Sequence, residues 1–237
     1  MKKSTKKYIN FLIFIVLGYF LQNNNLNSNT ISPIDIDSIK AQIIDEKSDF
    51  FYPKLYTKYS QNDTNISNNE YRYLYYGHSL QPYFDPRIIK TNDSVIALRK
   101  YLYSKQIDYR RVIELSNFVL RLDPFYLDGI YLLSSSYEKT GDSIKANLFR
   151  NKYYNLINTI WTSGDGKTPE TAFYVISLSD EYALIEALGL KINEHNSKKI
   201  NEKMYDVVTI GPNEMGYEQI YFNIELFYDK LINRGKK

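Results

Sequence analysis

The spacing of apolar residues along the chain changes near residue 160. Before that point apolar positions recur every three or four residues, which indicates amphipathic helices. After it, residues 171–178, 204–211 and 218–226 are short runs rich in β-branched and aromatic residues, which are typical of strands. The pattern predicts a mainly α-helical α+β protein. We expect helical hairpins over residues 35–160 and a small C-terminal module, a sheet with one helix, over residues 161–237.

Capping residues and prolines place the first helices. The apolar stripe that begins at Ile36 predicts a helix with Asp37 or Ser38 near its start. Pro53 kinks or restarts a helix, because its ring fits only the first turn. Ser67, followed three positions later by Glu70, is the capping-box pattern that opens a further helix.

Two stretches in the middle of the chain repeat with an offset of 34 residues, which is the tetratricopeptide period. The offset relates three kinds of position, namely Leu98 and Leu132 in the first helix, Tyr103 and Tyr137 near its end, and Asp108 and Asp142 after the turn. We predict two tetratricopeptide-like hairpins, with two ordinary amphipathic hairpins as the alternative. Because a repeat buries its apolar face only against a neighbour, the helices before Pro82 should cover one end of the pair and the segment after Trp161 the other.

Residues 161–173, WTSGDGKTPETAF, resemble a phosphate-binding loop at first sight. That motif needs a glycine five positions before Gly166, where this chain has Trp161, and it needs a strand before the loop and a helix after it. Here the predicted order is helix, loop, strand, so no helix N-terminus is aimed at an anion. Too few carboxylates are present for a calcium loop. We expect a turn in which Gly164 and Gly166 adopt positive φ.

The C-terminal module is predicted in more detail from its own signals. Residues 179–190 read as a helix capped by Ser179 and stopped at Gly189. The polar segment around His195, NEHNSKK, is expected to be an exposed loop. The chain should end in a short helix after the third strand.

The N-terminus has the pattern of an export signal. Four lysines precede an eleven-residue apolar run, residues 11–21, that is shorter than a membrane span of ~20 residues. We interpret residues 1–22 as a signal peptide, or as an uncleaved N-terminal anchor since no good cleavage site follows, and residues 23–34 as a flexible linker. The chain has no cysteine, which excludes disulfides and thiol chemistry. Export to the periplasm or cell envelope, or secretion, is therefore expected.

Charge argues against nucleic acid as a partner. The chain has 30 basic and 27 acidic residues, a net charge of +3, but its first 30 residues hold four lysines and no acid. The remainder therefore carries 26 minus 27, or −1. No basic field is left to attract nucleic acid or anionic lipid.

Few residues in the chain are candidates for catalysis or for binding a metal or ligand. With two histidines and no cysteine, a His-rich metal site and a cysteine nucleophile are excluded, and we expect no metal and no cofactor. No pair of carboxylates, Asp180 and Glu181 included, is singled out by its spacing. The best candidate for a ligand-binding site is the stretch around His78, whose members are Tyr71, Tyr75, His78, Tyr83 and Asp85. The alternative is that His78 is a packed core residue with satisfied hydrogen bonds.

Several segments resemble one known family. They are SDFFYPKLYTKYSQNDTNISNNEYRYLYYGHSLQPYFDP, SGDGKTPETAFYVISLSDEYALIEALGL, and YDVV and YFNIELFY near the end. They are similar to an uncharacterised family of exported bacterial proteins, mostly from Bacteroidetes, known only as a domain of unknown function. The resemblance covers roughly residues 35–230. It implies a secreted or periplasmic setting and supplies no activity, cofactor or catalytic residue.

Two functions follow as hypotheses. In the first, an exported noncatalytic scaffold of the cell envelope presents its hairpins to a protein or peptide, for which 24 tyrosines suit the surface. In the second, the protein is an enzyme or binds a small molecule or glycan in a pocket around residues 71–85. A concave pocket at His78 favours the second, and a buried His78 favours the first.

Overall fold

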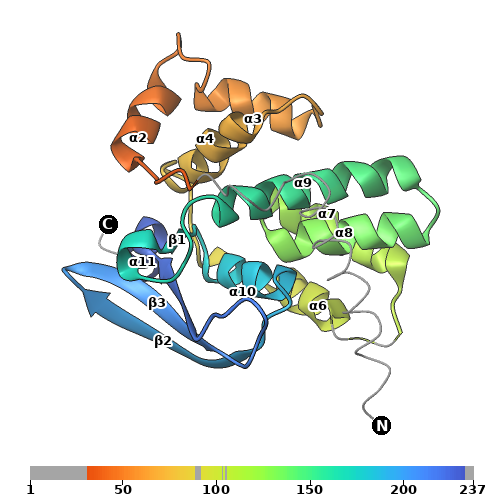
Figure 1. Ribbon diagram of the computed structural model, residues 1–237. Coiled ribbons are helices and arrows are strands. Elements are labelled where there is room, and N and C mark those ends of the chain that lie inside the picture. Colours follow the sequence, from red (N-terminus) through yellow and green to blue (C-terminus); the bar gives the residue numbers. More distant parts are fainter. Residues whose placement is uncertain (1–30, 89–91, 103, 105, 233–237) are drawn as a thin grey trace.

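The computed structural model describes residues 31–88, 92–102, 104 and 106–232 (Figure 1). The predicted signal peptide or anchor and most of the predicted linker lie outside these residues. Among the helices described, none is both long and apolar enough to span a bilayer. The described part is mainly helical with a small sheet near its C-terminus, as the sequence pattern predicts, and this sheet has four strands where three are expected.

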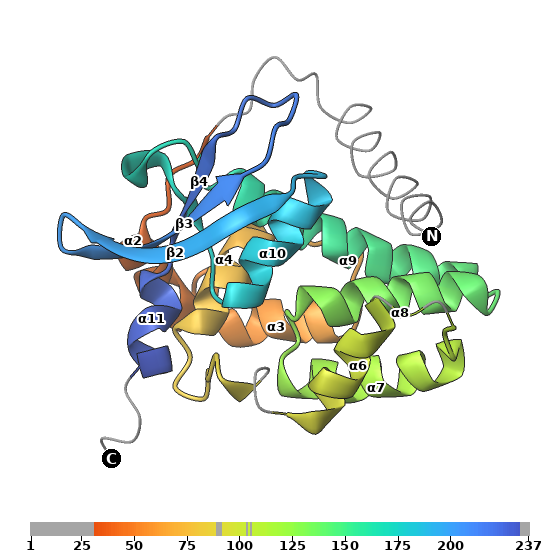
Figure 2. The ribbon, with the colours of Figure 1, turned by 90° about the horizontal axis from the view of Figure 1, so that it is seen from below.

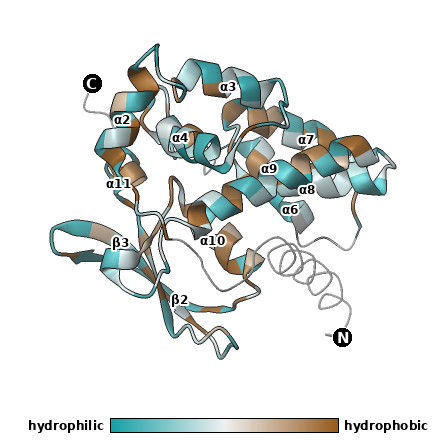
Figure 3. Cartoon of the chain, turned by 45° about the horizontal axis from the view of Figure 1, so that its top comes forward, coloured by the Kyte–Doolittle hydropathy of each residue, from teal (hydrophilic) through white to brown (hydrophobic). Residues whose placement is uncertain are grey.

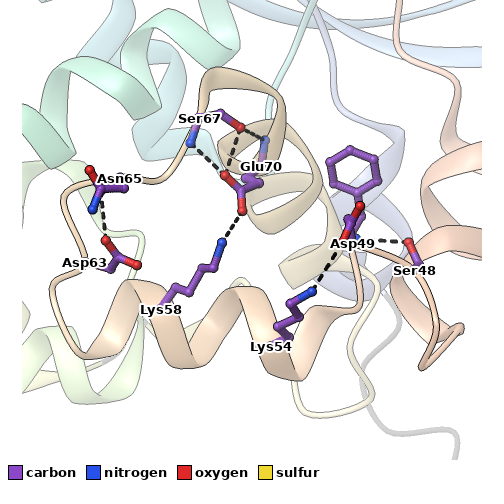
Figure 4. Close-up of polar contacts among 9 residues, drawn as sticks. Ser48, Asp49, Lys54, Lys58, Asp63, Asn65, Ser67 and Glu70 are labelled. Carbon is purple, nitrogen blue, oxygen red and sulfur yellow. Dashed lines mark hydrogen bonds and ion pairs between the residues drawn. The ribbon is translucent and has the colours of Figure 1, made fainter.

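Three short helices begin the described chain: α2 (Ile36–Ile44), α3 (Tyr52–Ser60) and α4 (Asn68–Ser79). Asp35, not Asp37 or Ser38, caps α2, and its carboxylate accepts a hydrogen bond from the backbone N–H of Ser38 at 2.9 Å. Pro53 lies in the first turn of α3, as expected. At the start of α4 the Ser67–Glu70 capping box is present in full (Figure 4).

The two predicted hairpins are α6 (Asp93–Leu102) with α7 (Tyr109–Leu122), and α8 (Leu127–Lys139) with α9 (Ser143–Trp161). The first residues of α6 and α8 are 34 positions apart, and so are those of α7 and α9. Asp108 and Asp142 are equivalent N-caps, each accepting a hydrogen bond from a backbone N–H three residues on. In Figure 3 these helices carry both apolar and polar bands, as expected for helices with one buried side.

The helices pack in chain order, α6 on α7, α7 on α8 and α8 on α9. Beyond them, α4 and α10 (Leu178–Ala187) both pack against α9. The Tyr-rich helices and the C-terminal module thus both lie against the second hairpin, rather than at opposite ends of the pair. The main core cluster contains residues of α2 to α4, of the second hairpin and of the sheet, whereas the first hairpin has a small separate cluster around Leu98 and Leu115.

The glycine-containing loop after α9 is a structural turn. Gly166 has φ of +66°, as predicted, but Gly164 is absent from the positive-φ positions. Gly164 is instead required by close packing, because a Cβ there would lie 2.2 Å from the carbonyl oxygen of Thr171. The backbone N–H groups of Asp165 and Gly166 both donate to that same oxygen, so they are used within the turn.

The sheet has the strand order β1-β4-β3-β2, with β1 (Phe173–Tyr174), β2 (Ile192–Ile200), β3 (Lys203–Ile210) and β4 (Gln219–Asn223). Strands β1 and β4 are parallel, and the other pairs are antiparallel. The strand expected over residues 171–178 is shorter, and the segment around His195 is not an exposed loop but lies in β2. Within the described residues β2 is an edge strand paired with β3, and its side chains are mostly exposed on both faces of the sheet, so it lacks the apolar alternation that marks a strand in sequence.

Helices flank the sheet. α10 lies beside β2 (Figure 2), and its N-cap position is Ser177 instead of Ser179. Gly189 ends α10 with φ of +69°, as expected. The short C-terminal helix is α11 (Glu225–Ile232), which contacts β3. The main core cluster runs across residue 160, so the predicted hairpin region and the predicted C-terminal module share buried residues.

Candidate functional site

The five residues predicted around His78 are divided between interior and surface. Tyr71, Tyr75 and His78 are buried, His78 with 4% of its surface exposed. Tyr83 is 64% exposed, and Asp85 is partly exposed. A ligand at this stretch can therefore reach Tyr83 and Asp85 without any rearrangement of the core, and its prediction as a binding site stays a prediction.

His78 lies among aromatic rings. Its Nδ1 is 2.9 Å from the hydroxyl of Tyr52, and its ring packs against Phe84 and Phe125. Its Nε2 is 3.9 Å from a carboxylate oxygen of Asp123. Burial, with the positive charge of Lys230, lowers the pKa of His78 to about 4. The side chain is therefore neutral at physiological pH, as expected of a packed core histidine.

The other members of the stretch also make internal contacts. The Tyr75 hydroxyl donates to a carboxylate oxygen of Asp180 at 2.7 Å, which joins α4 to α10. Burial raises the pKa of Asp180 to about 7. Asp85 is paired with Arg87 at 2.8 Å on the surface. The Tyr75–Asp180 contact thus belongs to a hydrogen-bonded core, whereas the Asp85–Arg87 pair lies at the surface.

A second group of polar side chains was not singled out by the sequence. It consists of Glu181 in α10, His195 in β2 and Asp206 in β3. Side chains alternate between the faces of a strand, so Asp206 lies on the same face of β3 as Val208 and Ile210, which belong to the main core cluster. In the antiparallel register His195 is opposite Val208, which places its ring on that face too. The first turn of α10 brings Glu181 to the same place.

Distances within this group, which we call the Glu–His–Asp cluster, are short. His195 Nε2 lies 3.0 Å from Glu181 Oε2 and 3.3 Å from Asp206 Oδ2. His195 Nδ1 lies 3.3 Å from the Tyr182 hydroxyl. The Ser197 hydroxyl donates to the other oxygen of Asp206. A single ring nitrogen, Nε2 of His195, thus faces two carboxylates. The other ring nitrogen contacts Tyr182, and the other oxygen of Asp206 accepts from Ser197.

The electrostatics of the cluster follow from burial and contact. The hydrogen bonds to Asp206 and Glu181 raise the pKa of His195 to about 10. Burial, together with the charge of Asp206, raises the pKa of Glu181 well above its usual value. Burial alone would raise the pKa of Asp206 as well, but hydrogen bonds from His195 and Ser197 bring it below its usual value. At neutral pH the cluster therefore holds a charged histidine beside an ionised Asp206, and burial shifts the pKa of Glu181 in the direction that favours its protonated form.

The sequence contained one signal for this cluster. The alternation in residues 204–210 places Asp206 on the apolar face of a predicted strand, where an unpaired carboxylate is costly. A partner was therefore required. The partners themselves could not be identified from the sequence. His195 lies in β2, which was predicted to be a loop, and Glu181 lies in the first turn of α10, where acidic residues are expected in any case because they interact favourably with the helix dipole.

A surface pocket lies elsewhere, between the start of α2 and the start of α11. Asp35, Asp37, Lys203 and Glu225 line it with apolar neighbours. Two of these lining residues, Lys203 and Glu225, form an ion pair at 3.7 Å. None of the five residues predicted around His78 lines this pocket.

Comparison with known proteins gives one family. The family described as a domain of unknown function (DUF4919) matches residues 37–233. No curated protein and no solved structure matches the chain. The match confirms that the resemblance seen in the sequence is to a domain of unknown function, while the exported and Bacteroidetes character of that resemblance stays a prediction.

Proposed function

The chain belongs to the DUF4919 family, a domain of unknown function, and we propose that it is an exported, noncatalytic scaffold that binds another protein through its first helical hairpin. The N-terminal sequence pattern supports export: a basic head, then an apolar run too short for a comfortable span. The two hairpins support protein binding, because arrays of this period bury their apolar faces against neighbouring helices.

The observation that carries the proposal is a difference between equivalent positions of the hairpins. Ile130 in the second hairpin is 1% exposed, while Ile96, 34 residues earlier, is 45% exposed. Lys152 in the second hairpin is 7% exposed, while Phe118, its equivalent, is 39% exposed. The second hairpin is thus covered at these positions, and the first is open.

The second hairpin is shielded from solvent by other segments of the same chain, and some of these segments are helices. The Lys152 ammonium donates to the backbone oxygen of Tyr59 in α3 at 2.9 Å and lies over the Tyr59 ring. Ile130 belongs to the same main core cluster as Tyr59. A helix of a partner protein is the occupant that suits the first hairpin, because it would cover Ile96 and Phe118 as the chain's own helices α4 and α10 pack on the second hairpin.

The test is capture of the partner from the envelope fraction of the native host. The full chain carries a C-terminal tag, and a variant with Ile96→Asp and Phe118→Asp is compared with Ile44→Asp, which changes a 70% exposed isoleucine on α2. We expect one stoichiometric protein, cross-linked to α6 or α7, with wild type and the Ile44 variant. Recovery should fall at least about tenfold with the double variant, a loss of ~1.4 kcal/mol in binding, since the substitutions place unpaired charges in the interface.

Equal recovery with all three proteins contradicts the proposed hairpin surface, and absence of any partner contradicts the scaffold. The same preparation tests export separately. The intact mass of the purified chain should correspond to cleavage near residue 22, or to the full chain in the membrane fraction if the segment is an anchor. Recovery of the full-length chain from the cytosol contradicts export.

The second function, binding of a small molecule or glycan around residues 71–85, rests on Tyr83. Its ring is 64% exposed, its hydroxyl is 3.4 Å from that of Tyr52, and Asp85 follows two positions later in the chain. An exposed ring with a nearby carboxylate is a feature that glycan sites use. A glycan screen with wild type and Tyr83→Ala tests this function, and equal profiles from both proteins contradict it.

A further inference from the structure

The Glu–His–Asp cluster brings three metal-ligating side chains from three different elements to one point. The oxygen of Glu181, the Nε2 of His195 and the oxygen of Asp206 all lie within 4.8 Å of one another. Glu181 and Asp206 are buried, with 1% and 4% of their surface exposed. The side chain of His195 is 22% exposed, so the point can be reached from solvent past the imidazole.

The spacing of these atoms matches a coordination sphere. With metal–ligand bonds of about 2.1 Å, neighbouring ligands are about 3.0 Å apart in an octahedron and about 3.4 Å apart in a tetrahedron. The two distances from His195 Nε2, 3.0 Å to Glu181 and 3.3 Å to Asp206, fall in this range. The Glu181 and Asp206 oxygens also lie within 4.8 Å of each other, so all three ligand atoms lie close to one point.

The surrounding groups orient the ligands. The Tyr182 hydroxyl faces His195 Nδ1, so the Nδ1–H donates there and Nε2 is directed to the cluster. Ser197 donates to one oxygen of Asp206 and leaves Oδ2 for the centre. Outer hydrogen bonds of this kind accompany metal-bound histidine and carboxylate ligands in general.

One atom of the cluster is unexplained by its protein contacts. Glu181 Oε1 is buried and has no hydrogen-bond partner among the residues described. A buried oxygen in that position loses its hydration without compensation. A cation bound by both oxygens of Glu181, or a water bound to that cation, satisfies it.

We propose that Glu181, His195 and Asp206 bind one divalent transition-metal cation of the zinc class, with water in the remaining positions. Three protein ligands of one nitrogen and two carboxylates suit Zn²⁺ or Mn²⁺ better than Ca²⁺, which prefers six to eight oxygens. The ion ties the first turn of α10 to the β2–β3 hairpin. The sequence argument that excludes a His-rich site does not apply to this one, since it needs a single histidine.

Binding exchanges the cation for protons. His195 must lose the proton on Nε2 and Glu181 its carboxyl proton, so one divalent ion enters and up to two protons leave. The titratable groups that face His195 are Glu181, Asp206 and Tyr182. Affinity should therefore increase with pH.

The experiment is titration of the metal-free full chain with Zn²⁺ against a chromophoric chelator, with Mn²⁺ and Ca²⁺ in parallel and a tag without histidine. We expect one equivalent of Zn²⁺ with a Kd of about 1 μM or tighter at pH 7.5. The Kd should weaken at least about tenfold per pH unit below pH 7, because at least one proton competes. Co²⁺ in place of Zn²⁺ should give visible d–d absorption that reports the nitrogen and oxygen ligands.

Near-isosteric variants locate the site. His195→Gln, Glu181→Gln and Asp206→Asn should each weaken Zn²⁺ binding at least about tenfold, the range found for loss of a ligand or of its outer partner. The control is Glu194→Gln, an exposed carboxylate next to His195 in β2, which should bind as wild type does. Far-UV circular dichroism of each variant shows that the fold is kept.

Two results overturn the proposal. One is less than about 0.2 equivalents of Zn²⁺, Mn²⁺ or Ca²⁺ bound by folded wild type at 100 μM free ion. The three side chains would then only form hydrogen-bonded ion pairs with one another. The other is wild-type Zn²⁺ affinity in the folded His195 and Asp206 variants, which would place the bound ion elsewhere.

Discussion

At the scale of single residues, the two histidines lie in opposite environments. His78 is enclosed by aromatic rings and by Tyr52, and burial lowers its pKa to about 4. His195 faces two carboxylates, which raise its pKa to about 10. From the sequence, His78 was the better candidate for a functional residue, because it lies on a predicted amphipathic helix, whereas His195 lies in a run of polar residues. Neighbours from other elements decide the charge of each ring.

Both histidines make stability depend on pH, with opposite sign. The depressed pKa of His78 means that stability is full above about pH 6.5 and declines as the pH falls toward 4, by about 3 kcal/mol in all. The raised pKa of His195 means that its contribution is full below about pH 6.5 and is lost as the pH rises toward 10. The combined contribution of the two histidines to the free energy of unfolding should therefore be largest near pH 6.5 to 7.

The first prediction concerns these two side chains in the metal-free protein. In ¹⁵N-edited NMR of labelled histidine, His78 should remain a neutral imidazole down to about pH 5, and His195 should remain an imidazolium up to about pH 9. His195→Gln removes one set of signals and assigns them. Two ordinary titrations near pH 6.5 would contradict both the enclosure of His78 and the ion triad at His195.

At the scale of secondary-structure elements, local sequence signals and packing agree best in α4. Ser67 accepts a hydrogen bond from the backbone N–H of Glu70, and Glu70 accepts one from the backbone N–H of Ser67 (Figure 4). Glu70 also pairs with Lys58 of α3 at 2.6 Å. The cap is thus both a local helix start and a link between two helices.

The second prediction is that Ser67→Ala lowers the free energy of unfolding by about 1 kcal/mol, because a first-turn N–H of α4 loses its acceptor. Chemical denaturation followed by circular dichroism measures it. Asn69→Ala, an exposed change in the same first turn that leaves the Ser67 hydroxyl in place, is the control and should stay within about 0.5 kcal/mol of wild type. Equal effects of the two substitutions would show that the box contributes no more than helix propensity.

At the scale of the whole molecule, α4 connects the N-terminal helices to the C-terminal module. Tyr75 donates to Asp180 in α10, and Tyr76 donates to the backbone oxygen of Tyr174 at 3.2 Å. Lys230 of α11 donates to the backbone oxygen of Ser79 at the end of α4. The two regions separated by sequence pattern near residue 160 are therefore one unit in the main core cluster.

The third prediction follows from this shared core. Tyr75→Phe removes the hydroxyl that donates to the buried Asp180 and should cost about 1 to 3 kcal/mol. Circular dichroism, which reports mainly the helices, and fluorescence of Trp161, which stacks on Phe173 of β1, should shift by the same amount. Tyr83→Phe, at an exposed ring, is the control. Separate midpoints for the two signals would mean that the helical part and the sheet unfold independently.

The sequence by itself determined the features that depend on neighbours a few positions away. They are the 34-residue period with its equivalent positions Asp108 and Asp142 after the turn, the capping box at Ser67 and Glu70, and the rejection of a phosphate loop around Gly166. Caps, turns and amphipathic periods are local, so residues three to seven positions apart are enough to specify them.

Only the tertiary structure decided what depends on residues far apart in the chain. It placed Asp180 against Tyr75, 105 positions away, and gathered Glu181, His195 and Asp206 at one point. It made β2 a strand although its side chains are polar, because its backbone pairs with β3 whatever the side chains are. The charge of a buried group is set by the atoms around it. In this protein those atoms belong to elements far apart in the chain, and local sequence patterns do not show which of these elements are in contact.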